Sequence, residues 1–496
     1  MSDPSLNRLA NGVIWPGFGG LSAPAWLQDA LQEGLAGVVY FSGNLDPDDA
    51  GQPARLSGQI HRLNPDALIG VDEEGGLVTR LEAGRGSSVP GNAALGVLDD
   101  PELTRRAHAW LGALVRTAGI DVDLAPDADV NVNPNNPVIG VRSFGADPEL
   151  VARHTAAAVS GLQSQGVAAC GKHFPGHGDC LTDSHLGPAV SRVSSEELRA
   201  VHLAPFQAAI AADVKAIMTA HIVVPAFGDL PATVNPRLLG LLRQMGFDGL
   251  IVTDALEMAA IRDTLGVGPG AVAALAAGAD LLCVGNPGTR RTPDGAPLDE
   301  TSFLEVRDAI VAALQDGRLS PDRLADAIQR RKQVVAWRHE QPTDGRPSAS
   351  WDGREAARRA LQSNGHVHLR EGTVLVVDAR AGRNQAAGPT ADPFTRALRA
   401  YRRVDRMALS ELTEEEVSTR VQAACAYAGP LVILVNQPQI ADQERRVAQL
   451  VSRGRPDAVI IQVGWPAPDL LGAANWVLTR GTSAVTAAAL AELLTG

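Results

Sequence analysis

The chain has 496 residues, of which 45% are apolar and 20% charged, as expected for a globular protein with two or three domains. Its 56 acidic residues outnumber its 44 basic ones, so the net charge of −12 argues against a nucleic-acid binder or an anionic-membrane binder with a basic face. The 4 cysteines have no CxxC spacing, no apolar run approaches a bilayer span of roughly 20 residues, and the N-terminus lacks a signal-peptide layout. We therefore expect a cytoplasmic protein with no membrane partner.

Short apolar runs alternate with amphipathic stretches from the N-terminus to about residue 340. These runs predict strands at Gly12–Ile14, Gly37–Phe41, Ala67–Val71, Val122–Ala125, Val167–Ala169, Ala216–Thr219, Gly249–Thr253 and Asp280–Val284. Strand-then-helix units in this number fit a (β/α)8 barrel of the TIM type. A doubly wound open sheet is the alternative, and the number of units favours the barrel.

A second α/β domain is predicted after the barrel. Residues 341–355 are rich in turn-forming residues and read as a linker, which gives a barrel over 1–340 and a smaller α/β sandwich domain over 356–496. Three apolar strands, Val374–Val377, Leu431–Val435 and Ala458–Val463, are separated by helical patterns. The residues after the first of them form neither a GxGxxG fingerprint nor a Walker loop, so the sequence gives little support to a nucleotide-binding role.

Polar side chains follow several of the barrel strands directly. Asp72-Glu73-Glu74 and Lys172-His173 follow two of them, and His221 and Asp254 follow two others. In a barrel all these positions lie on the carboxyl-terminal face, where active sites are built. Strand exits that serve stability alone would be mostly small or apolar, so the pattern favours an active site over that alternative.

The segment Lys172–His185 holds three histidines, two aspartates and a lysine. His173 and His177 are four residues apart, but Pro175 and Gly176 between them prevent the helix on which paired zinc ligands would share a face. We therefore expect no metal and no cofactor. A solvated polar loop is the simpler alternative, although it does not explain why the titratable groups gather after one strand.

Asp183 and His185 suggest a proton-transfer pair. A carboxylate that accepts a hydrogen bond from one imidazole nitrogen fixes the tautomer and leaves the other nitrogen to move protons. Asp254, at the exit of another barrel strand, is the candidate nucleophile. A carboxylate nucleophile with a proton donor meets the requirement for retaining glycoside hydrolysis, although the usual donor is a second carboxylic acid.

Several motifs resemble those of family 3 glycoside hydrolases, and within that family the bacterial β-N-acetylglucosaminidases. The matching segments, in family order, are Gly70–Gly76, Asn136–Gly145, Lys172–His185, Met218–His221, Pro231–Thr233, Gly246–Gly249 and Ile251–Met258. The resemblance spans roughly residues 10–335, and the part after 350 resembles the second domain of the family only loosely. Leu77 and Glu73 depart from the pattern, since the family usually has arginine and glutamine there.

The resemblance implies a role for each matching residue. Asp254 is expected to form the covalent glycosyl-enzyme, and His185, oriented by Asp183, to act as acid and then base. Side chains expected to hold sugar hydroxyls are those of Asp72, Arg142, Lys172 and His173, with His221 as a wall of the pocket or as a structural histidine. The expected partner is a β-linked GlcNAc glycoside derived from cell-wall fragments or a related source, and the expected assembly is a monomer or weak homo-oligomer.

Other functions remain open at this point. A phosphorylase fits the same residues, because a histidine acid/base does not repel an incoming phosphate as a carboxylate would. A broader β-glycosidase is also compatible. A non-catalytic sugar-binding protein conflicts with the intact Asp183, His185 and Asp254 set, and a Schiff-base aldolase would rest on Lys172 alone.

Overall fold

The computed structural model describes residues 4–183, 187, 189–285, 295, 298–341, 351–380, 385–387, 392–467 and 472–496. These residues form two compact units. The first comprises Met1–Glu74, Pro101–Val130 and Ala146–Trp351, and the second comprises Gly75–Asp100, Asn131–Gly145 and Asp352–Gly496. Two segments from the barrel half of the sequence therefore belong to the second unit.

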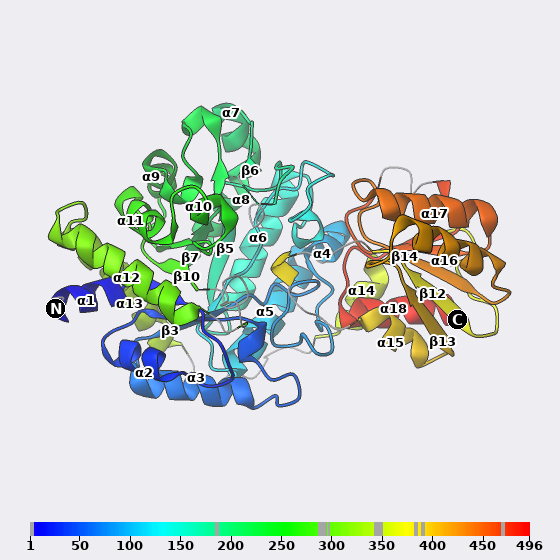
Figure 1. The fold of residues 1–496 in the computed structure, drawn as a ribbon, viewed down its shortest axis with the longest axis horizontal. Coiled ribbons are helices and arrows are strands. Elements are labelled where there is room, and N and C mark those ends of the chain that lie inside the picture. Colours follow the sequence, from blue (N-terminus) through cyan, green and yellow to red (C-terminus); the bar gives the residue numbers. More distant parts are fainter. Residues whose placement is uncertain are drawn as a thin grey trace. The chain divides into compact units, whose positions relative to one another are not determined.

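A curled parallel sheet forms the centre of the first unit (Figure 1). Its continuous part has the order β2 (Gly37–Tyr40), β3 (Leu68–Val71), β4 (Val122–Asp123), β5 (Ala168–Phe174), β7 (Ala216–Thr219) and β9 (Leu250–Thr253). A bridge from Val252 to Leu281 joins β9 to β10 (Leu282–Val284), which pairs with β1 (Ile14–Pro16). The amide of Ala36, just before β2, donates to the carbonyl of Asn11, just before β1. The last strand pair thereby connects back to β2, the first strand of the continuous sheet. The predicted barrel fold is confirmed.

Helices follow the strands and lie outside the sheet (Figure 1). In the first unit they are α1 (Pro4–Asn11), α2 (Ala25–Gln32), α3 (Gln52–Leu63), α5 (Pro101–Thr117), α6 (Pro148–Gln163), α7 (Ser195–Glu197), α8 (Ala204–Ala211), α9 (Pro236–Gln244), α10 (Ala259–Arg262), α11 (Val267–Ala277), α12 (Asp299–Gln315) and α13 (Pro321–Glu340). Local sequence fixes several starts: Asp147, Asn235 and Ser320 each cap a helix whose next residue is proline. Two short strands, β6 (Ala189–Val190) and β8 (Ile222–Val223), pair beside the barrel.

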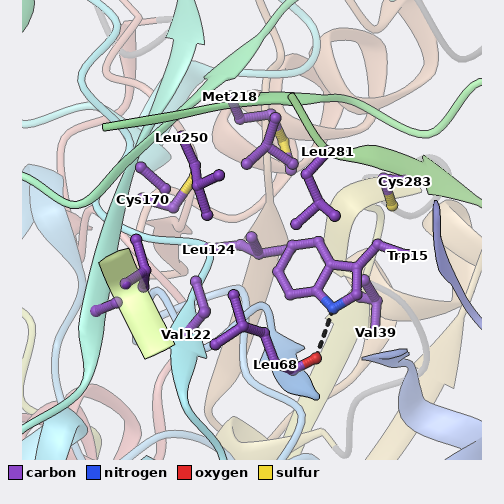
Figure 2. Packing of buried hydrophobic residues seen from close by; sticks show 14 of the residues in the cluster. Trp15, Val39, Leu68, Val122, Leu124, Cys170, Met218, Leu250, Leu281 and Cys283 are labelled. Carbon is purple, nitrogen blue, oxygen red and sulfur yellow. Dashed lines mark hydrogen bonds between the residues drawn. The ribbon is translucent and has the colours of Figure 1, made fainter. Parts of the chain in front are cut away.

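Apolar side chains from the barrel strands fill the interior of the sheet. Figure 2 shows Trp15 at the centre of this cluster, with its Nε1 donating to Leu68 O at 2.7 Å. Its neighbours include Val39, Val122, Leu124, Cys170, Met218, Leu250, Leu281 and Cys283. Gly70 must be glycine here, because a Cβ would lie 2.4 Å from the Trp15 ring. A packed interior leaves the loops at the ends of the strands as the place for a site.

The second unit is an α/β sandwich around a sheet of order β11 (Gln362–Asn364), β16 (Trp476–Leu478), β15 (Val459–Gln462), β14 (Leu431–Val435), β12 (Val374–Asp378) and β13 (Val404–Ala408). The strands are parallel except β11. One face packs against α15 (Pro393–Arg399) and α18 (Ala484–Thr495), and the other against α16 (Glu414–Ala426) and α17 (Asp442–Gly454). Helices α14 (Gly353–Ala360) and α4 (Asn92–Leu98) lie side by side at the α18 side. The predicted second α/β layer domain is thereby confirmed.

Candidate active site

A buried lysine lies among carboxylates at the ends of β3 and β5. Lys172 is 2% exposed, and its Nζ lies 2.7 Å from Asp72 Oδ1 and 2.7 Å from Glu74 Oε1. Burying an ammonium group is costly unless opposite charges lie close to it. The two carboxylates therefore allow Lys172 to be buried here. In return the lysine fixes Asp72, the more exposed of the two acids. The result is a rigid set of charged groups at the carboxyl-terminal face.

The next residue of β5, His173, is held by an aspartate that follows β4. Its Nδ1 lies 2.7 Å from Asp129 Oδ2, while Asp127 Oδ2 lies 3.9 Å from the same nitrogen. Asp129 is fully buried, and burial favours the neutral acid. The charge of His173 and the hydrogen bonds that the carboxylate accepts nevertheless keep its pKa below the usual value. A proton on Nδ1 directed at Asp129 leaves Nε2 for other contacts.

These three residues also bear on the metal question. Ligand atoms of Asp127, Asp129 and His173 lie within 4.8 Å of one another, which is close enough to hold a cation. The 2.7 Å hydrogen bond from Nδ1 to Asp129 explains the same arrangement without one. A metal at this position would have to replace that Nδ1 proton.

The loop after β5 is tied to the same aspartate. The backbone amide of His177 donates to Asp129 Oδ1 at 2.6 Å. Burial lowers the pKa of His177 to about 4, so its ring is neutral at neutral pH. Gly176 lies against the His202 ring, where a Cβ would come within 2.7 Å of the His202 Cβ. His177 thus shapes the start of the loop that leads to Asp183.

The turn that begins with Asp72 is fixed from below by a second buried acid. The amide of Glu73 donates to Asp123 Oδ1 at 3.0 Å, and both residues are fully buried. Burial, reinforced by the charge of Glu73, raises the pKa of Asp123 well above its usual value. The neutral form of Asp123 is therefore favoured over the charged form beside Glu73.

Asp254 and His221 follow β9 and β7, which pair in the sheet. Asp254 is partly exposed, and its Oδ1 accepts a hydrogen bond from the Ala255 amide at 2.8 Å. His221 is buried, with Nδ1 2.7 Å from Thr233 Oγ1 and Nε2 2.9 Å from Ala255 O. Because a carbonyl only accepts, Nε2 carries the proton. His221 thus holds the residue that follows the candidate nucleophile.

Two of the predicted site residues, Asp183 and His185, follow β5 in the sequence. Asp183 is described and is 8% exposed. His185, the predicted acid/base, lies outside the described residues. The predicted pairing of these two side chains stays a prediction from the sequence.

Arg142 lies in the second unit. It is buried at the end of the short turn Gly140–Arg142, with its Nη1 3.4 Å from Val138 O and its own carbonyl accepting from Asn92 Nδ2 at 2.7 Å. The other described candidates, Asp72, Lys172, His173, Asp183, His221 and Asp254, lie in the first unit. The structure brings Asp72 and Lys172 into direct contact, with His173 next along the same strand.

Asp127, Asp129 and Glu74 were not among the predicted site residues. Asp127 and Asp129 come a few residues after the short strand Val122–Asp123, so the rule that polar groups follow strands could have found them. Glu74 stands beside Asp72 in the sequence, but which of the acids faces Lys172 depends on the turn. Only the folded chain shows that two of them do.

Comparison with known proteins gives consistent matches. The model described as the glycosyl hydrolase family 3 N terminal domain matches residues 24–334. A beta-hexosaminidase of Stenotrophomonas maltophilia is 41% identical over 282 residues, which is 55% of this chain and 82% of that protein. A beta-hexosaminidase of Xylella fastidiosa is 38% identical over 271 residues, covering 53% and 78% of the two chains.

Solved structures match over nearly the whole chain. A glycoside hydrolase family 3 β-N-acetylglucosaminidase from Paenibacillus sp. has a TM-score of 0.86 and 32% identity, and the match covers 99% of this chain and 96% of that one. No helix in the described part of the chain is long and apolar enough to cross a membrane.

Proposed function

The chain belongs to glycosyl hydrolase family 3 and is a glycoside hydrolase, and from that premise we propose that it is a retaining exo-β-N-acetylglucosaminidase. The beta-hexosaminidases and the Paenibacillus β-N-acetylglucosaminidase that it matches support β-linked GlcNAc as the sugar. The observation that carries the proposal is the set of Asp72, Lys172 and His173, whose side chains are held in place by hydrogen bonds and ion pairs and can offer polar groups to sugar hydroxyls. They come from the same sheet as β9, the strand that Asp254 directly follows.

The proposed reaction is a double displacement. The Asp254 carboxylate attacks the anomeric carbon as the bond to the leaving oxygen breaks, and a covalent glycosyl-aspartate forms. Water then attacks the same carbon, the bond to Asp254 breaks, and the sugar leaves with its original configuration. Asp254 is suited to attack because it is partly exposed, and the Ala255 amide fixes the orientation of the carboxylate through Oδ1.

His185, oriented by Asp183, is the proposed proton donor to the leaving oxygen and the base that activates water in the second step. Asp183 is buried, which supports its proposed role as the carboxylate that orients the imidazole. His221 supports the reaction indirectly, since its Nε2 holds the carbonyl of Ala255, the residue after Asp254, while Thr233 holds its Nδ1. Arg142 is the proposed additional hydroxyl contact.

The sugar is proposed to come from cell-wall fragments, and the protein to act in the cytoplasm. A small, uncharged sugar fits a site whose charged groups already have partners within the protein: Lys172 lies between Asp72 and Glu74, and Asp129 lies against His173. The proposed site therefore offers directed hydrogen bonds more than net charge.

A rate survey tests the proposal. Aryl β-GlcNAc and aryl β-glucoside are compared in buffer without phosphate and with added phosphate. We expect faster cleavage of the GlcNAc substrate, free GlcNAc as the product in both buffers, and initial release as the β-anomer. GlcNAc-1-phosphate as the main product would assign a phosphorylase, and equal rates on the two sugars would assign a broader β-glycosidase.

The leaving group separates the acid from the nucleophile. We expect His185→Ala to slow substrates with poor leaving groups far more than activated aryl substrates, because only the former need the proton. Equal losses on both substrate types would remove His185 from the acid role.

A further inference from the structure

Two segments of the second unit, Gly75–Asp100 and Asn131–Gly145, follow residues of the proposed sugar site in the sequence. The first starts directly after Asp72-Glu73-Glu74, and the second starts shortly after Asp129. Arg142 lies on the second segment. The groups that hold these segments come mainly from the part of the chain that follows Asp352.

Glutamines of the sandwich hold the Asn131–Gly145 segment by its backbone. Gln437 Nε2 donates to Asn136 O at 2.9 Å, and Gln439 Nε2 donates to Pro134 O at 3.1 Å. Gly140, the first residue of the turn that ends at Arg142, lies against the same glutamine, where a Cβ would be 3.5 Å from Gln437 Nε2. Gln437 thus lies against the segment at two positions, Asn136 and Gly140, both of which precede Arg142 in the sequence.

Gln437 is itself rigidly placed. It follows β14, and the amides of Asn436 and Gln437 donate to Glu444 Oε2 at 2.6 Å and 2.9 Å. Glu444 is 1% exposed and lies in the first turn of α17, where the helix dipole favours a carboxylate. Strands β12 and β14 are neighbours although β13 lies between them in sequence, so Gln437 stands at the point where the strand order reverses. Doubly wound sheets usually bind a ligand there, and here the Asn131–Gly145 segment has contacts at this place.

The Gly75–Asp100 segment is held in the same unit and is linked to Arg142. Arg80 is 8% exposed and donates to Ala386 O at 2.7 Å and Ala387 O at 2.9 Å. The amide of Ala484, at the start of α18, donates to Ser87 O at 3.0 Å. Asn92 of this segment then donates to the Arg142 carbonyl at 2.7 Å. Both segments and the sandwich therefore form one hydrogen-bonded assembly.

We propose that the sandwich serves the reaction by positioning Arg142, with Gln437 as the main positioning residue. This inference rests on the proposed function, because it assumes that Arg142 binds the sugar. A segment of this length without long helices or strands loses much conformational entropy when it is ordered. Contacts with the sandwich meet that cost before the substrate arrives, so less binding energy is spent on ordering Arg142.

The test compares two matched glutamines in the full chain. Gln437→Ala and Gln437→Glu are set beside Gln443→Ala and Gln443→Glu, because Gln443 is also partly buried and its Nε2 donates to a backbone carbonyl, Leu409 O, at 3.0 Å. We expect Gln437→Ala to raise KM for the aryl β-GlcNAc substrate by roughly threefold to tenfold with little change in kcat, the scale of one lost hydrogen bond. Gln437→Glu should raise KM further, because a carboxylate then faces the Asn136 carbonyl. Both Gln443 variants should stay within about twofold of wild type.

A double-mutant cycle with Arg142→Ala separates positioning from general stability. If Gln437 acts through Arg142, Gln437→Ala should change KM by less than about twofold in the Arg142→Ala background, although it changes it in the wild type. Multiplied effects, or Gln437 variants that match the Gln443 variants, would overturn the inference. A wild-type chain that cleaves no aryl β-GlcNAc would instead overturn the proposed function.

Discussion

The carboxyl-terminal ends of the two parallel sheets carry charged side chains, but the two sheets use them differently. In the barrel, Lys172 is buried between Asp72 and Glu74, and His173 against Asp129. In the sandwich, Asp378 at the end of β12 is bound through both its oxygens by Arg380 and through one by Arg406. The barrel groups belong to the proposed sugar site, whereas in the sandwich Asp378 pairs with arginines and amides such as that of Gln437 hold chain segments.

The position of a charge relative to a sheet therefore does not decide its role. The same topology places polar groups at the ends of the strands in both units. What differs is the exposure of the acid and the kind of partner that holds it. Asp254 in the barrel is partly exposed and its Oδ1 accepts from the Ala255 amide, whereas in the sandwich burial opposes the ionisation of Asp378 and the arginines nevertheless hold its pKa below the usual value.

The largest effect is expected for Asp254, the partly exposed acid after β9. Asp254→Ala should lower kcat for an aryl β-GlcNAc substrate by at least about 10³-fold, because the nucleophile of a covalent reaction cannot be replaced by its neighbours. Initial rates with a circular dichroism check of folding measure this. A folded variant that keeps more than a tenth of wild-type activity would show that the reactive group lies elsewhere.

The next effect compares a buried cation of the barrel, Lys172, with a partly exposed cation of the sandwich, Arg380. Lys172→Met should lower kcat/KM by roughly 100-fold and destabilise the chain by about 3–5 kcal/mol, because Asp72 and Glu74 lose their shared counter-charge. Arg380→Met should cost about 1 kcal/mol, since Arg406 still pairs with Asp378, and should leave kcat/KM within about twofold. Urea unfolding and steady-state kinetics measure both variants. Similar kinetic losses in the two would erase the distinction between the sheets.

A smaller effect tests how His173 is held. Asp129→Asn keeps the shape of the side chain but removes the charge that faces Nδ1, so kcat/KM should fall by roughly 10-fold to 100-fold, the range of a charge-assisted hydrogen bond. Asp127→Asn is the matched control, because Asp127 lies 3.9 Å from the same nitrogen. It should change kcat/KM by less than about threefold. Equal losses in the two variants would mean that the negative charge of the cluster matters and not the hydrogen bond.

The last prediction concerns acid stability and again separates the units. Burial lowers the pKa of His108, which lies on α5, to about 4. It also lowers the pKa of His177 to about 4. Unfolded histidine titrates near pH 6.5, so the unfolded chain takes up protons first and each group contributes stability that is lost as pH falls from about 6.5 to about 4. The loss is about 3 kcal/mol for each group. In the sandwich, His366 and His368 are exposed.

Hydrogen exchange of the full chain at pH 7 and pH 4.5 measures this difference. Helices α5 and α6 should lose protection in acid before α16 and α17 do. His108→Gln should reduce the difference, because the unfolded chain then gains one proton fewer. Equal loss of protection in both units would assign the acid sensitivity to other groups.

Much of the fold could be read from the order of apolar runs. Each predicted barrel run overlaps a strand, because parallel strands covered on both faces need nearly continuous apolar residues. Asp254 was also correctly placed directly after a strand, whereas Lys172 and His173, which we expected after the strand, lie inside β5 near its carboxyl end. Sequence order did not reveal that Gly75–Asp100 and Asn131–Gly145 belong with the sandwich, since the residues that hold them, such as Gln437, lie about 300 positions away.

The sequence by itself determined the barrel, the sandwich and the candidate residues near the ends of the strands, because these depend on local periodicity and on residues next to strands. Only the tertiary structure decided which acids neutralise Lys172, that Asp129 orients His173, and that the segment bearing Arg142 is held by Gln437. Those partners are polar residues in loops, and loops have no periodic pattern that would identify one polar residue as the partner over another. Burial and distance, which exist only in the folded chain, give each of them its charge state and its role.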